Sequence, residues 1–225
     1  MGQVAEVYRL LGADAVYVSP KAASWLTQDG GKLPENFWQP QAEPISRIFE
    51  VSGRRVGVVF FRAAPQTATR STTSGNTGSS VKSTLPIAQR GPLTEAELAS
   101  HAAYLEEAAK CGRQLAPQVD LLIGVSPWGY RVERHFIGQT PGLYHILLGG
   151  GSGLSFPYAS TEGGYPLIWS RPYPEGRSVN LIKLYEWPQP GISQWTPEIS
   201  FGADFEDLGS SIPSDPEIAG LLPQY

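Results

Sequence analysis

Apolar residues along this chain recur with the two periods that distinguish helices from strands. Helical spacing is seen over residues 3–11, 94–112 and 216–222. Short apolar or alternating runs, typical of strands, cover residues 15–18, 45–51, 54–61, 119–125, 144–148, 166–170 and 178–187. Because helical and strand segments follow one another along the chain, the pattern predicts an α/β fold.

The clearest local signal is the start of the helix at Thr94. Thr94 and Glu97 have the spacing of a capping box, and Leu93 and Leu98 have the spacing of the hydrophobic staple that accompanies it. The run VDLLIGV, residues 119–125, follows this helix and is continuously apolar, as in a strand that is covered on both faces. A helix followed by a buried strand is half of a crossover unit.

Two further segments define how the chain is organised. Ser52-Gly53 separates the β-rich runs ISRIFEV and RRVGVVFF, and this arrangement predicts a hairpin. Residues 65–92 are rich in Ser, Thr and Gly and have no apolar period, which predicts a long surface loop or insertion. A length of 225 residues suits one sizeable core, so we expect residues 1–225 to form a single domain.

Composition and charge exclude several classes of protein. The net charge of −4 comes from scattered residues with no basic stripe, so nucleic acid is not expected as a partner. Cys111 is the only cysteine, which rules out an internal disulfide and any CxxC metal or redox motif. No apolar run approaches the roughly 20 residues of a membrane span, and the first residues lack the order of a signal peptide. We therefore expect a soluble chain without its own export signal. The chain starts inside a helical pattern, which leaves open whether a further portion lies upstream.

The glycine-rich stretch GGGSG, residues 149–153, directly follows the apolar run YHILL. Successive backbone N–H groups in such a turn can bind an anion. The turn lacks the Gly-Lys-Ser/Thr ending of a P-loop, and no acidic residue is placed to hold a ribose. The serine in GVSPWG likewise lacks the glycine spacing of a nucleophile elbow. The sequence therefore does not favour phosphate cradling or nucleophilic hydrolysis.

The order of these segments resembles the metal-dependent phosphoesterase domain of the 5′-nucleotidase and UDP-sugar hydrolase family. YRLLGADAVYVSP is similar to the helix and strand that end in an Asn-His-Glu turn, YLEEAAKCGRQLAPQVDLLIGVSPWGY to those that lead to a Ser-His-x-Gly turn, and PGLYHILLGGGSG to the strand that ends Gly-Gly-His-x-His. RRVGVVFFRA, RSVNLIKLYEW and SDPEIAGLLPQY resemble further segments. The resemblance covers nearly the whole chain and implies a calcineurin-like fold, an α/β two-sheet metallophosphoesterase-like sandwich flanked by helices and lacking its first strands.

The resemblance also implies a two-metal centre, but the matched positions carry other residues. Pro20 and Lys21 stand where the family has Asn and His, Pro127 where it has the histidine of Ser-His-x-Gly, and Gly151 and Gly153 where it has two metal-binding histidines. The family's Asp-x-His strand and the Gly-Asp after it would lie upstream of the first residue. Since none of these five side chains can replace an imidazole or carboxylate ligand, we expect no metal, no cofactor and no phosphoester hydrolysis.

Aromatic and polar residues crowd the turns that surround the active face in that family. They form the candidate surface for a ligand or partner: Ser126, Trp128, Tyr130, His135, Ser152, Tyr158, Trp169 and Tyr173. Such rings can stack a sugar or base or anchor a protein partner, although core packing is their commoner role. His135 is expected in a loop near Glu133 and Asp120, where a hydrogen-bonded loop histidine is favoured over a rebuilt catalytic site.

These observations favour a non-catalytic metallophosphoesterase-like protein, a pseudoenzyme that serves as a binding or assembly subunit. A protein partner or a homo-oligomer is expected, because a sheet that has lost strands presents unpaired backbone groups. Two alternatives stay open. One is a 5′-nucleotidase-like hydrolase completed by an upstream segment or a second chain, and the other is a carbohydrate-binding module. The resemblance implies a periplasmic or extracellular location, which the missing export signal does not support.

Overall fold

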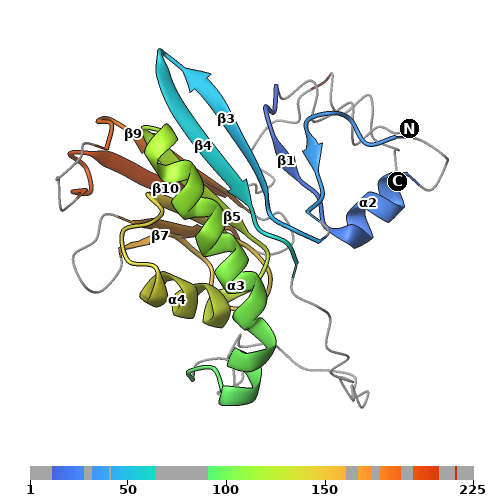
Figure 1. Cartoon of the computed structure of the whole chain (residues 1–225). Coiled ribbons are helices and arrows are strands. Elements are labelled where there is room, and N and C mark those ends of the chain that lie inside the picture. Colours follow the sequence, from blue (N-terminus) through green and yellow to red (C-terminus); the bar gives the residue numbers. More distant parts are fainter. Residues whose placement is uncertain are drawn as a thin grey trace, which may run out of the picture.

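The computed structural model describes residues 12–27, 32–40, 42–63, 91–160, 167–173, 178–188, 195–207 and 216. Its centre is a six-stranded sheet in the order β3-β4-β5-β6-β8-β7 (Figure 1). The strands are β3 (Ile45–Val51), β4 (Arg54–Phe60), β5 (Leu121–Ser126), β6 (Ile146–Gly149), β7 (Phe156–Ser160) and β8 (Ile168–Arg171). β4, β5, β6 and β8 run parallel, and the edge strands β3 and β7 are antiparallel to their neighbours. The protein is therefore a mixed α/β protein.

Two helices cover one face of this sheet (Figure 1). α3 (Glu95–Leu115), followed by the short η2 (Ala116–Gln118), crosses from β4 to β5, and α4 (Tyr130–Gln139) crosses from β5 to β6. The predicted capping box is confirmed, because Glu97 N donates to Thr94 Oγ1 at 3.3 Å and Thr94 N donates to Glu97 Oε2 at 2.7 Å. The main core lies beneath these helices and includes Val59, Phe61, Tyr104, Ala108, Leu122, Phe136 and Leu147.

Two small sheets lie over parts of the opposite face. β1 (Val16–Tyr17) pairs in parallel with β2 (Phe37–Trp38), and α2 (Pro20–Leu26) follows β1. Trp38 meets Phe60 of β4 edge to face, with ring centroids 4.7 Å apart. β9 (Ser178–Leu184) pairs antiparallel with β10 (Phe201–Asp207), whose Phe201 is buried in a cluster with Ile146 and Ile168. The described chain thus has a helical layer, a central sheet and an incomplete third layer of strands.

All seven predicted strands are confirmed, with ends shifted by at most three residues. The hairpin at Ser52-Gly53 is present, and the predicted buried strand at 119–125 corresponds to β5. β2, β7, β10, α2 and α4 were not predicted, because these segments are short or have no clear apolar period. The helix over 3–11 and the loop over 65–92 lie outside the described residues, apart from residues 91 and 92, as does all of the 216–222 helix except Pro216.

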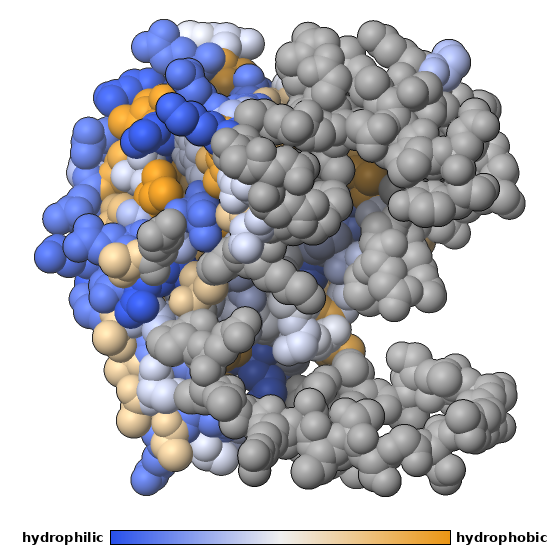
Figure 2. Space-filling model, turned by 90° about the vertical axis from the view of Figure 1, so that its right-hand side faces the viewer, coloured by the Kyte–Doolittle hydropathy of each residue, from blue (hydrophilic) through white to orange (hydrophobic). Residues whose placement is uncertain are grey.

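Seen from the right-hand side of Figure 1, the part drawn in colour is mainly hydrophilic, with small separate apolar areas (Figure 2). Among the described residues, none of the helices has the length and apolar character needed to cross a membrane.

Candidate functional site

The carboxyl ends of the parallel strands meet at one edge of the sheet, where α/β proteins usually bind ligands. Ser126 ends β5 opposite Gly149, which ends β6, and Arg171 ends β8. α4 begins four residues after Ser126 and brings Glu133 back over this edge within its first turn. We refer to the buried polar contacts of Ser126, Glu133, Trp169 and Arg171 as the edge network.

Glu133 is the centre of the edge network and has no exposed surface. Its Oε1 accepts hydrogen bonds from Ser126 Oγ at 3.0 Å, from Gly150 N at 3.2 Å and from Gly129 N at 3.3 Å. Its Oε2 accepts from Trp169 Nε1 at 3.0 Å and forms an ion pair with Arg171. Five donors on one buried carboxylate offset the cost of removing its charge from water.

Arg171 connects this carboxylate to the glycine-rich turn. Its Nε donates to Leu154 O at 2.6 Å, and its Nη2 donates to Gly151 O and to Ser152 O at 3.1 Å each. Only 2% of the arginine is exposed. The guanidinium therefore holds the turn through its backbone carbonyls, and the same group balances the charge of Glu133.

The turn can be held so closely because its glycines have no side chains. Gly151 has φ 68°, and a Cβ there would lie 2.6 Å from Pro127 O. Gly153 has φ 120°, and its Cβ would lie 2.5 Å from Tyr130 Cβ. A Cβ on Gly149 would overlap the carboxylate of Glu133. The backbone that GGGSG approaches is therefore the β5–α4 connection of the same chain.

Of the residues matched to metal ligands, Pro127, Gly151 and Gly153 bring no side-chain donor to the carboxyl edge of the sheet. The backbone oxygen of Pro127 faces Gly151, and the backbone oxygen of Gly151 accepts a hydrogen bond from Arg171. Gly153 packs on Tyr130. Pro20 begins α2, and the side chains of Pro20 and Lys21 lie outside the described part. Within the described ranges, no group of three or more His, Cys, Asp or Glu side chains is placed to hold a metal ion. The donors at this edge therefore do not fit a dinuclear metal centre.

Five of the candidate surface residues lie at or beside the edge network: Ser126, Trp128, Tyr130, Ser152 and Trp169. Both tryptophans are buried. Trp128 stacks on Phe61 at 4.7 Å and its Nε1 donates to Arg62 O at 2.8 Å, while Trp169 stacks on Tyr130 at 5.2 Å. The rings of Trp128 and Trp169 therefore pack against other side chains of this protein and are not part of its exposed surface.

The other candidate residues lie elsewhere. Tyr158 is in β7 and packs on Phe201 of β10, and the exposed Tyr173 lies 5.8 Å from Phe205 between ring centroids. His135 is on α4, so the expectation of a loop there was wrong. The run YRVERHFIG has alternating charges that hide its helical apolar face of Val132 and Phe136.

His135, Glu133 and Asp120 do not form one site. Asp120 precedes β5, at the end opposite to Ser126, and its Oδ2 accepts from Arg55 N at 2.8 Å. That backbone hydrogen bond, with the nearby Arg54, lowers the pKa of the Asp120 carboxyl. A six-residue strand separates the two ends by roughly 20 Å.

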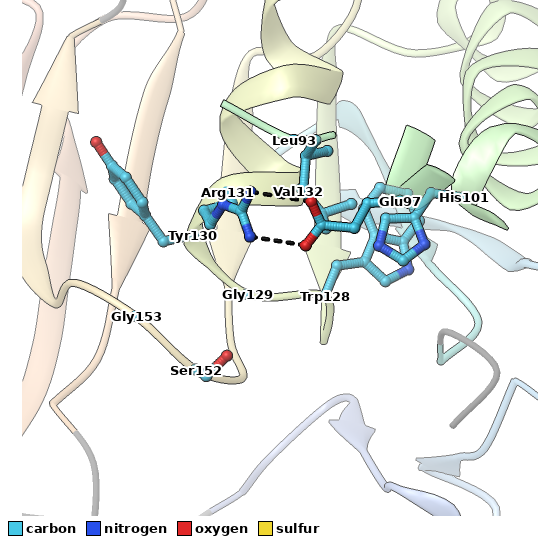
Figure 3. A pocket seen from close by; sticks show the side chains of 10 residues that line it. All are labelled: Leu93, Glu97, His101, Trp128, Gly129, Tyr130, Arg131, Val132, Ser152 and Gly153. Carbon is cyan, nitrogen blue, oxygen red and sulfur yellow. Dashed lines mark hydrogen bonds and ion pairs between the residues drawn. The ribbon is translucent and has the colours of Figure 1, made fainter. Parts of the chain in front are cut away.

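A hollow of about 120 Å³ opens beside the edge network between α3 and α4 (Figure 3). In it, Arg131 donates to both carboxylate oxygens of Glu97, at 2.8 and 3.0 Å. Hydrogen bonds from Arg131 and Thr94 hold the pKa of Glu97 at about 2. Figure 3 shows His101 beside Glu97, while the ring of Tyr130 points away from the ion pair. The polar groups of this hollow are largely bound to each other.

Two contacts of the site, Glu133 with Arg171 and Glu97 with Arg131, were not predicted from the sequence. Arg171 directly follows the apolar run PLIWS, and a charged residue that ends a buried strand is a signal for a buried ion pair. The contact between Glu97 and Arg131 left no signal, because the two residues are 34 positions apart on different helices.

No protein-family model and no curated protein matches the chain. Among solved structures, the chain is similar to a hypothetical protein from Thermus thermophilus, with 14% identity and a TM-score of 0.37. The similarity covers 74% of this chain and 55% of that protein, so the chain spans about half of its length. The class of protein that fold and site define is a mixed α/β protein with a closed polar network at the carboxyl edge of its sheet.

Proposed function

We propose that this chain is a non-catalytic relative of the metal-dependent phosphoesterases that serves as a binding or assembly subunit. The observation that carries the proposal is the edge network. It fills the carboxyl edge of the parallel strands, where the resemblance places the histidines of the Ser-His-x-Gly and Gly-Gly-His-x-His turns. In this proposal the fold is a two-sheet phosphoesterase-like sandwich without its first strands, and β9–β10 and β1–β2 are the remaining parts of its second sheet.

The chemistry of this edge supports a structural role for its polar groups. A carboxylate such as that of Glu133 can bind a cation, but Arg171 already supplies its positive charge. The backbone oxygens of Gly151 and Ser152 already accept hydrogen bonds from the positively charged side chain of Arg171. A metal ion entering here would have to displace a buried guanidinium, which would then lack a partner. The arrangement therefore favours a fixed scaffold over a reactive centre.

The proposal is tested by metal analysis of the purified protein and by a phosphoesterase assay. The assay would use bis-p-nitrophenyl phosphate, a nucleoside 5′-monophosphate and a UDP-sugar, with manganese, zinc or iron supplied. We expect metal well below one equivalent per chain and no hydrolysis above the rate seen without protein. Stoichiometric metal together with hydrolysis that a chelator abolishes would overturn the proposal.

A variant separates structural from catalytic use of the edge network. Glu133→Gln removes the charge of the central carboxylate while keeping its shape. If the network is structural, the variant is less stable than the unaltered chain, and neither protein hydrolyses a substrate in the assay. If a preparation of the unaltered chain hydrolyses a substrate and Glu133→Gln at equal folded concentration does not, the network is part of a catalytic site.

A further inference from the structure

An apolar groove lies on the face of the central sheet opposite α3 and α4. It has a volume of about 490 Å³. Its floor is formed by side chains of the parallel strands β4, β5 and β6, and its walls by β1 and the end of β3. The floor residues are Val56, Val58, Phe60, Ile123, Val125 and Leu148. Parallel strands are normally covered on both faces. Here Val56 and Phe60 are buried, whereas Val58, Ile123 and Val125 remain partly exposed. Leu148 is 37% exposed, although it lies in a strand whose other residues are mostly buried.

One wall of the groove is β1, and no described strand pairs with its edge on the side away from β2. Val16 N donates to Asn36 O at 2.8 Å and Val18 N donates to Trp38 O at 2.9 Å, so alternate residues of β1 face β2. Ala15 and Tyr17 line the groove, and their backbone N–H groups point away from β2. Within the described part of the chain, neither N–H group has a hydrogen-bond partner. The hydroxyl of Tyr17 is also buried without a partner there.

Acidic side chains stand at the rim of the groove. Asp14 precedes β1 and Glu50 lies near the end of β3, and both line the groove and are exposed. Neither forms an ion pair with another described residue. An occupant that carries a basic side chain next to an apolar stretch would therefore match the groove in charge as well as in hydrophobicity.

We propose that the groove binds an extended strand of a partner protein, which pairs with the free edge of β1 and lays alternate apolar side chains on the floor. This is β-strand addition, in which backbone hydrogen bonds supply affinity and side-chain pockets supply specificity. The partner segment has apolar residues at every second position and a lysine or arginine at the end near Asp14 and Glu50. The inference rests on the proposed function, because it names the surface and the partner class of the binding subunit.

The test uses the full chain and a synthetic peptide of about eight residues, in which valine and threonine alternate between terminal lysines. A matched peptide carries terminal glutamates instead. Binding is measured by titration calorimetry, and pairing with β1 by hydrogen exchange of the Ala15 and Tyr17 amides. We expect the lysine peptide to bind, to weaken with added salt and to protect both amides, and the glutamate peptide to bind at least about tenfold more weakly.

Two variants locate the binding surface. Leu148→Glu places a charge on the groove floor at a position that is already partly exposed, so the fold tolerates it. Val179→Glu on β9 is the control, because Val179 is also a partly exposed apolar strand residue and does not line the groove. We expect Leu148→Glu to weaken peptide binding at least about tenfold and Val179→Glu to leave it unchanged.

Several outcomes would overturn the inference. They are absence of binding at about 1 mM peptide, equal binding of both peptides, and equal loss in both variants. Protection of the Tyr17 amide without peptide would show that this chain covers its own groove. Protection that rises with protein concentration, together with dimers in sedimentation, would show that a second copy is the occupant. Metal-dependent hydrolysis would overturn the proposed function, whatever the peptide result.

Discussion

At the scale of single residues, Glu133 and Arg171 form an ion pair that is almost completely buried. A buried ion pair is balanced only when both partners are present, because either charge alone would be left without compensation in a dry site. Arg171 additionally donates to two backbone oxygens of the glycine-rich turn and to that of Leu154 just after it, and Glu133 accepts from two backbone N–H groups. The two side chains therefore hold together backbone from β6, β8 and the start of α4.

Removing either partner of this pair is predicted to be strongly destabilising. Arg171→Met and Glu133→Gln should each lower the free energy of unfolding by about 3–5 kcal/mol, since each leaves a buried polar group unmatched. The double variant should lose less than the sum of the two single losses. Denaturant unfolding measures all three. Losses below about 0.5 kcal/mol in the single variants would show that the pair is exposed to water.

His145 gives the protein a predicted pH dependence. Its Nδ1 accepts a hydrogen bond from Leu122 N at 2.9 Å, and burial lowers the pKa of its imidazole. In the folded state the imidazole therefore binds a proton less readily than in the unfolded state. The resulting stability is present above the unfolded pKa of about 6.5 and is lost as the pH falls through the folded pKa.

The measurement is the melting temperature at pH 7.5 and at about pH 5.5, in the unaltered chain and in His145→Gln. The unaltered chain should lose stability over this interval, and the variant should lose less. Burial also lowers the pKa of His101, so His101→Gln is compared in the same way to separate the two contributions. An equal loss in the unaltered chain and in His145→Gln would contradict the assignment to His145.

At the scale of elements, the glycine-rich turn and α4 are fitted to each other. Gly151 and Gly153 have positive φ and contact the backbone of the β5–α4 connection, so both conformation and space exclude a side chain. Gly138 is also a glycine of this region, but it lies in α4 at an exposed position where a Cβ would meet nothing within 4 Å. These positions make a matched comparison.

Alanine should therefore have opposite effects in the two places. Gly151→Ala and Gly153→Ala should each lower the free energy of unfolding by more than about 1 kcal/mol, because the native φ is incompatible with a Cβ. Gly138→Ala should raise it by up to about 1 kcal/mol, because alanine favours the helix. Chemical denaturation of the three variants measures these changes. Stabilisation by Gly151→Ala would contradict the described geometry of the turn.

At the scale of the whole molecule, the core and the edge network join the same elements. The main core packs α3 and α4 on the sheet, and the edge network ties α4 to β5, β6 and β8. We therefore predict one cooperative unfolding transition. Tryptophan fluorescence, which reports on Trp128 and Trp169 among the six tryptophans, should follow the same curve as far-ultraviolet circular dichroism. Two separated transitions would contradict the prediction of a single domain.

Part of the candidate site at the carboxyl edge of the sheet was predicted from the sequence. The capping box of Thr94 and Glu97 fixed the start of α3, because its signal is local. Ser126, Trp128, Ser152 and Trp169 were candidate residues and do lie at the edge. The contacts of Ser126, Ser152 and Trp169 with Glu133 or Arg171 were not foreseen, since they join residues up to 36 positions apart.

The sequence by itself determined the α/β class, the hairpin, the start of α3 and the buried strand β5, because each depends on apolar period or capping within a few residues. Tertiary structure alone decided that GGGSG faces Arg171 and Pro127, that Asp120 and Glu133 stand at opposite ends of β5, and that β1 borders an apolar groove. Those relations depend on the order and direction of strands in the sheet. Neither is encoded in the spacing of neighbouring residues.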